Sequence, residues 1–70
     1  MGMADNEIPT GTRAVMIAFT TEKGTPRVTF DLIDGRWATK TLAWLTSAAI
    51  SAVLNSDQGD IVTYKTHFIA

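Results

Sequence analysis

The hydrophobic pattern begins with two segments of strand character. Residues 13–21 (RAVMIAFTT) are rich in β-branched and aromatic side chains, and their centre is apolar at consecutive positions. Such a run is typical of a strand that is covered on both faces or lies at an interface. Residues 27–33 (RVTFDLI) alternate instead, with Val28, Phe30 and Leu32 on one face. The short connection, which contains Gly24, predicts a β-hairpin.

The longest patterned segment runs from Trp37 to Asn55 and has helical periodicity with almost no polar face. At about 100° per residue its apolar side chains fill roughly half of the circumference, and Ala43, Ile50 and Leu54 add a second apolar patch. We expect Asp34 to be the N-cap, because a carboxylate accepts the free N–H groups at the positive end of the helix dipole. A helix that is apolar nearly all round is expected to be buried on more than one side.

Residues 61–69 (IVTYKTHFI) form the last predicted strand, after a turn in which Asn55 or Gly59 adopts the left-handed conformation. The order β-β-α-β predicts a small two-layer α+β domain, in which an antiparallel hairpin contributes to a three-stranded sheet and one long helix packs on that sheet. Residues 13–70 then form a single domain. Residues 1–12 contain Pro9 and Gly11 and show no hydrophobic period, so they are expected to form a flexible N-terminal arm.

Size favours completion of this domain by homodimerisation. A chain of 70 residues has little material with which to cover both the apolar helix and the apolar first strand. It has no cysteine, so disulfides cannot add stability. Pairing through the helices and pairing through edge strands both remain open. The candidate helix interface has one aromatic and three small residues, namely Trp44, Ala48, Ala49 and Ala52.

Charge and length exclude several classes of function. Six basic residues stand against seven acidic ones, and the net charge is −1. Non-specific binding to nucleic acid or to an anionic membrane needs a basic excess. The apolar runs are much shorter than the ~20 residues of a membrane span, and residues 1–11 lack the pattern of a signal peptide. We therefore expect a cytoplasmic protein, with nucleic acid an unlikely partner and no membrane partner.

Candidate catalytic and metal-binding residues are few. His67 is the only histidine, and no motif links it to a nucleophile or to an orienting carboxylate. Asp31 and Asp34 precede the predicted helix whereas Asp57 and Asp60 follow it, so the two pairs lie too far apart to share a cation. We expect no catalytic residue, no metal and no cofactor.

The strongest small-ligand candidate is the start of the predicted helix. Arg36 and Lys40 lie four residues apart there, next to Trp37 and after Gly35. Free N–H groups at a helix N-terminus favour an anion, although no glycine-rich phosphate motif accompanies them. Arg36, Lys40 and Trp37 are therefore candidates for contact with a small anion or with a protein partner.

Three hypotheses of function follow. The first is a small non-enzymatic interaction protein, of the phage or mobile-element type, that binds another protein and inhibits or redirects it. The alternative is a dimer that binds or sequesters a nucleotide or another small anion. The third is a nucleic-acid-associated regulator, which the near-neutral charge disfavours.

Overall fold

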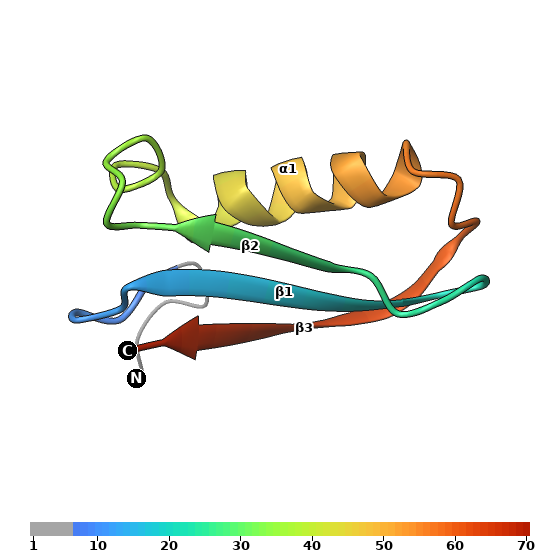
Figure 1. Ribbon diagram of the computed structural model, residues 1–70, viewed down its shortest axis with the longest axis horizontal. Coiled ribbons are helices and arrows are strands. Elements are labelled where there is room, and N and C mark those ends of the chain that lie inside the picture. The colour runs from blue at the N-terminus through green and yellow to red at the C-terminus, as the bar shows by residue number, and fades with distance from the viewer. Residues whose placement is uncertain (1–6) are drawn as a thin grey trace.

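The computed structural model describes residues 7–70 and has the expected α+β class (Figure 1). Its elements, in chain order, are β1 (Ala14–Thr21), β2 (Arg27–Asp31), α1 (Leu42–Leu54) and β3 (Ile61–Ile69). The predicted hairpin and the three-stranded sheet are confirmed, and β3 is also antiparallel to β1. Half of the predicted N-terminal arm, residues 1–6, lies outside the described residues. In the other half, Ile8 packs against the core.

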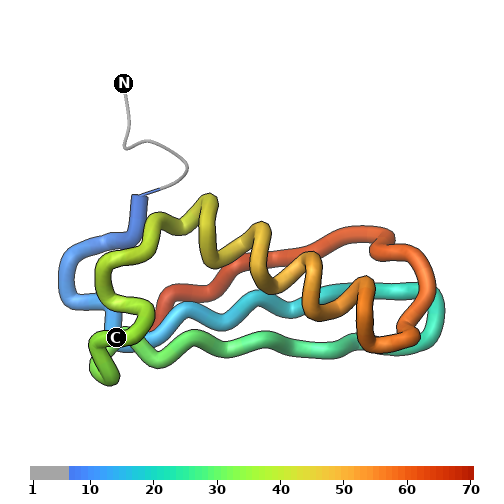
Figure 2. Tube along the Cα trace, turned by 90° about the horizontal axis from the view of Figure 1, so that it is seen from above, coloured from blue at the N-terminus to red at the C-terminus, as the bar shows by residue number. Residues whose placement is uncertain are grey.

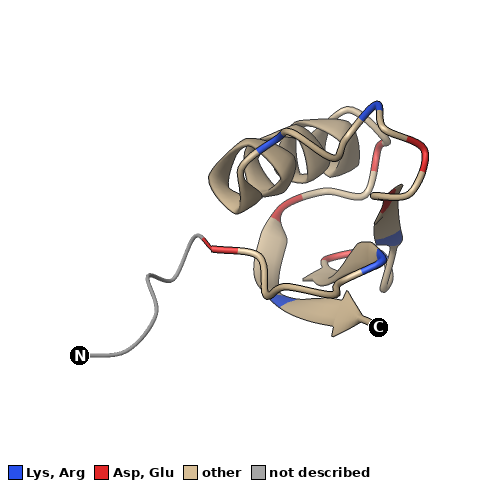
Figure 3. Ribbon diagram, turned by 90° about the vertical axis from the view of Figure 1, so that its left-hand side faces the viewer, with Lys and Arg blue, Asp and Glu red and all other residues tan. Residues whose placement is uncertain are grey.

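β1 is the central strand, because β2 and β3 both pair with it and give the order β2-β1-β3. The register places Ala18 of β1 between Arg27 of β2 and Lys65 of β3. Since side chains alternate along each strand, the sheet has two distinct faces. α1 lies on one of them, as the end-on view in Figure 3 shows. No other described element covers the second face, which we call the open face.

The core fills the space between α1 and the sheet. Its buried side chains come only from β1, β2 and α1, and they are Val15, Ile17, Phe19, Phe30, Leu42, Leu45, Ala49 and Val53. Full burial of a large apolar side chain contributes about 1.5–3 kcal/mol, so this one-sided core is the main source of stability. β3 adds only the partly buried Ile61. α1 runs obliquely across the sheet in Figure 2, and no side chain of β3 is fully buried beneath it.

The predicted N-cap at Asp34 is wrong, because α1 begins at Leu42 rather than at Trp37. Thr41 is the N-cap, and its hydroxyl oxygen accepts the N–H of Trp44 at 3.1 Å. Bends and turns occupy residues 32–39, where Gly35 has a φ of +86°. That left-handed residue interrupts a helix that would start nearby. Within the described residues no helix is long and apolar enough to cross a membrane.

The β1–β2 turn is joined to the α1–β3 loop by hydrogen bonds. The Glu22 carboxylate accepts the backbone N–H of Asp60 at 2.9 Å. Gly59 follows the prediction with a φ of +78°, and a Cβ at this position would collide with Glu22. Asn55, the other residue proposed for a left-handed turn, stays right-handed with a φ of −86°. Glu22 and Asp60 therefore have structural roles at this end of the sheet.

Substitution of Ala49 tests the one-sided packing of α1. Ala49 has no exposed surface, so Ala49→Trp overfills the core and should lower the free energy of unfolding by about 1–3 kcal/mol or more. Ala52 is exposed on the same helix, and Ala52→Trp should change it by less than about 0.5 kcal/mol. Urea denaturation of both variants measures the difference. Equal stabilities would contradict this orientation of α1.

Candidate functional site

The predicted anion-contact residues lie in the turns before α1 and form a stacked cluster. The Arg36 guanidinium carbon lies 5.9 Å from the centre of the Trp37 ring. Lys40 Nζ lies 4.5 Å from the centre of the Trp44 ring, and the two indole centroids are 5.7 Å apart. Both cations therefore lie over aromatic faces, which is a favourable arrangement in itself. Arg36, Trp37 and Lys40 all precede the first turn of α1. Contact between these residues and an anion therefore stays a prediction.

The predicted helix-interface residues do not share one surface. Trp44 is 43% exposed and Ala52 is also exposed, whereas Ala48 is half-buried and packs against the core. Ala49 is fully buried beneath the helix, where its small side chain lets α1 approach the sheet. Ala49 is therefore not available at the surface of the protomer. Trp44, Ala48 and Ala52 remain the accessible members of this set.

Exposed apolar surface is concentrated on β3. Seven large apolar side chains are exposed among the described residues, and four of them belong to this strand: Val62, Tyr64, Phe68 and Ile69, with exposed fractions of 70%, 46%, 41% and 43%. Tyr64 and Phe68 pair with the buried Phe19 and Val15, so they point to the same face as α1. The Tyr64 ring lies 5.7 Å from the Phe19 ring.

A shallow groove follows the boundary between α1 and β3. Its volume is about 420 Å³, and its lining consists entirely of uncharged residues, namely Leu42, Ala43, Thr46, Ser47, Ile50, Tyr64 and Thr66. The groove lies where α1 passes β3 without burying its side chains, since the fully buried side chains of the sheet belong to β1 and β2. It is an apolar surface that no described part of the chain fills.

The two outer strands of the sheet differ in how their edges are protected. β2 has five residues, follows Pro26, and carries Arg27 and Asp31 at its ends. Short length, charge and proline are the usual features that prevent an edge strand from pairing with another chain. β3 has nine residues, and Lys65 is its only Lys, Arg, Asp or Glu. The unprotected edge of this sheet is therefore the outer edge of β3.

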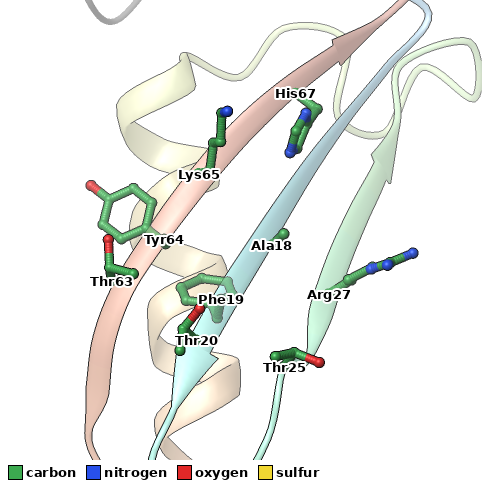
Figure 4. A pocket seen from close by; sticks show the side chains of 9 residues that line it. All are labelled: Ala18, Phe19, Thr20, Thr25, Arg27, Thr63, Tyr64, Lys65 and His67. Carbon is green, nitrogen blue, oxygen red and sulfur yellow. The ribbon is translucent and has the colours of Figure 1, made fainter.

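The open face carries a second group of functional candidates. Arg27 and Lys65 flank Ala18 across the three strands, and the neighbouring row places His67 beside Met16. The lining of a hollow of about 450 Å³, which is shown in Figure 4, includes Ala18, Arg27, Lys65 and His67. The polar lining of the hollow also includes three threonines: Thr20 of β1, Thr25 of the β1–β2 turn and Thr63 of β3.

Neither cation of the open face is paired with a carboxylate of the described residues. The one ion pair within residues 7–70 joins Lys23 and Asp57, with 3.8 Å between Nζ and Oδ1. Asp31 lies at the far end of β2, where its carboxylate accepts the N–H of Ile33 at 2.9 Å. Arg27 and Lys65 therefore present two positive charges to solvent on one side of the sheet.

Within residues 7–70 no side chains are arranged as a catalytic or metal-binding group. His67 is half-buried on the open face, and no hydrogen bond within residues 7–70 joins it to a carboxylate. No group of three or more His, Asp or Glu residues is placed to hold a metal ion in this part of the chain. The acidic residues act locally instead, as Asp31 and Asp57 show through their contacts with Ile33 and Lys23.

Comparison with known proteins adds no family to this description, since no family model, no curated protein and no solved structure matches the chain. Two candidate surfaces emerge from the structure, namely the β3 edge with its groove and the open face.

The sequence placed Arg27 and Lys65 on predicted strands but did not show that they lie close together. Their juxtaposition depends on β1 lying between β2 and β3, which local alternation alone does not determine.

Proposed function

We propose that this chain is a small non-enzymatic interaction protein that forms a homodimer through β3 and, as a dimer, binds another protein and inhibits or redirects it. The observation that carries the proposal is the exposed apolar side chains on an unprotected edge strand. Exposed apolar surface of this kind marks interaction sites, and an open strand edge supplies a row of backbone hydrogen-bonding groups.

The sheet edge is favoured over the helices as the dimer contact. On α1, Ala49 is buried within the protomer, and Trp44 already contacts Trp37 and Lys40. On β3, pairing with a second copy would satisfy the outer backbone groups and bury apolar side chains at once. The result is a continuous six-stranded antiparallel sheet with both helices on the same face.

Cross-strand chemistry selects one register for this pairing. A twofold axis at Thr66 places Tyr64 opposite Phe68 of the second copy, and Lys65 opposite His67. Aromatic pairs across antiparallel strands are favourable, and like charges directly opposite each other are not. An axis at Lys65 would oppose the two Lys65 side chains, and an axis at Tyr64 would leave Phe68 without a cross-strand aromatic partner. We therefore assign the axis to Thr66.

The dimer creates the surface for a further protein. Because the side chains of β3 stay exposed or half-buried beside α1 in each protomer, the helix-side residues of the two β3 strands would lie side by side between the two helices. Tyr64, Thr66 and Phe68 form the floor, and Ala43 and Ser47 lie on the helical walls. Since the groove lining is uncharged, the segment that it fits is the apolar face of a helix or extended peptide of the target.

A charge placed on β3 tests the dimer. Phe68→Lys removes the aromatic pair and puts a lysine at the contact, so the solution mass should fall from a dimer to a monomer. Ile33 is 63% exposed and lies outside β3, which makes Ile33→Lys a matched control that should remain dimeric. Light scattering over a dilution series measures both masses. A wild-type chain that is monomeric throughout would overturn the proposal.

A single cysteine tests the register, since the chain has none of its own. At the proposed axis the two Thr66 Cβ atoms lie about 5 Å apart, close to disulfide distance. Thr66→Cys should therefore form a cross-linked dimer under mild oxidation. Thr63 pairs with Ile69 of the second copy in this register, so Thr63→Cys should stay uncross-linked. Efficient cross-linking of Thr63→Cys, seen on a non-reducing gel, would exclude this axis.

A charge in the groove separates target binding from dimerisation. Ala43 is exposed and lines the groove, whereas Ser51 is exposed on α1 and does not line it. Ala43→Lys should keep the dimeric mass yet lose any protein that the wild type retains from a cell extract, because it places a charge against an apolar segment. Ser51→Lys should retain the same protein. Equal retention by both variants would remove the groove from the proposal.

A further inference from the structure

We propose that the open face binds the phosphate group of a small phosphorylated molecule, of about mononucleotide size, between Arg27 and Lys65. This site is separate from the groove, because it lies on the opposite face of the sheet from α1. Arg27 and Lys65 belong to the same protomer, so the inference does not require the dimer.

The spacing of the two cations suits one phosphate group. Arg27 and Lys65 are separated by two strand spacings, which is roughly 10 Å between backbones. Ala18 lies between them, and its methyl group leaves room for a ligand above the central strand. Long flexible side chains on both sides can reach a phosphate centred over Ala18. In Figure 4 the Arg27 side chain extends outward from β2, so we expect it to turn inward when ligand binds.

The charge of the site favours an anion. Neither Arg27 nor Lys65 has a carboxylate partner among residues 7–70, whereas Lys23 does. A phosphate supplies several acceptor oxygens, and arginine can bind two of them at once through its planar guanidinium group. Such charge-assisted hydrogen bonds are stronger than those between neutral groups. An uncharged ligand would form only the weaker hydrogen bonds with these two cations.

The surroundings indicate a ligand larger than phosphate alone. The hollow of about 450 Å³ lies within the range of ~300–1,000 Å³ that is usual for small-molecule sites. The hydroxyl groups of Thr20 and Thr63 lie in the row next to the cations on one side. On the other side the imidazole of His67 lines the hollow, and Ala18 gives it a small apolar floor. An uncharged, partly apolar group attached to the phosphate therefore fits this face.

A nucleic acid fits less well than a small molecule. Binding to a phosphodiester backbone depends on neutralising several phosphates, and its strength grows with the number of basic contacts. The hollow holds two Lys or Arg residues, and the whole chain has a net charge of −1. Two cations match one phosphate group, and the surrounding protein supplies no continuing basic track along the described strands.

The experiment is a titration of isotope-labelled full-length protein with AMP, followed by backbone amide NMR. AMP should shift the resonances of Ala18, Arg27 and Lys65 in a saturable manner, whereas adenosine, which lacks the phosphate, should bind at least about tenfold more weakly. Arg27→Gln and Lys65→Gln should each weaken AMP binding by about tenfold or more. Lys23→Gln removes the same charge from the turn, and it should change the affinity by less than about twofold.

Four results would overturn the inference. These are an absence of saturable shifts with AMP, equal binding of adenosine, equal losses in Lys23→Gln and Arg27→Gln, and tight binding of an eight-residue oligothymidylate without binding of AMP. The last result would assign the face to nucleic acid. The spectra also report folding, so a variant that fails to fold is recognised directly. The wild-type mass, measured separately, shows whether the dimer fails independently of this site.

Discussion

The packing of α1 against β1 and β2 is the contact on which the rest of the structure depends. Leu45 and Ala49 are buried against this part of the sheet together with Ile17 and Phe19. A helix with its side chains is about 10 Å wide, and strands are spaced about 4.8 Å apart, so a helix that crosses the sheet obliquely shields about two strand widths at any point along its length. Residues 7–70 contain no second helix that could bury the side chains of β3.

Both candidate surfaces follow from this limited coverage. On the helix side, α1 leaves Tyr64 and Phe68 exposed beside a groove. On the other side the whole sheet is bare, and its small central residue, Ala18, lies between two long cations. The charged and hydroxyl-bearing side chains of this second face suit it to water, whereas the exposed apolar side chains on the helix side of β3 are typical of an interaction surface. On the two proposals, the two faces therefore serve different kinds of partner.

Local patterns predict the elements of this fold but not their exact ends. Period-2 alternation and β-branched residues were sufficient for the hairpin and for β3. The start of α1 was not predictable in this way, because Thr41 competes with Asp34 as a cap and Gly35 adopts a positive φ. A helix wheel beginning at Trp37 also made the apolar stripe too wide, so the predicted helix interface combined the exposed Ala52 with the fully buried Ala49.

The candidate sites were harder to predict because they depend on contacts between distant residues. Arg27 and Lys65 are 38 positions apart in the chain, and only the pairing of both strands with β1 brings them to either side of Ala18. The groove likewise depends on which strands α1 covers, which the apolar pattern of β3 does not reveal. Arg36 and Lys40 are close in sequence, so local reasoning found them first. The structure places these two over indole rings, whereas Arg27 and Lys65 have neither a carboxylate nor an aromatic ring as a partner among the described residues.

The two proposals meet at Lys65, whose backbone lies on the dimer edge and whose side chain lies on the open face. In the register with its axis at Thr66, the two Lys65 side chains occupy diagonal positions, roughly 7–8 Å apart. Their mutual repulsion opposes pairing, and a phosphate bound to each protomer would neutralise it. Since linkage between two equilibria is reciprocal, a ligand that strengthens the dimer must also bind the dimer more tightly than the monomer. On these proposals the open face is therefore the place where a small anion can control the form of the protein that is available to its target.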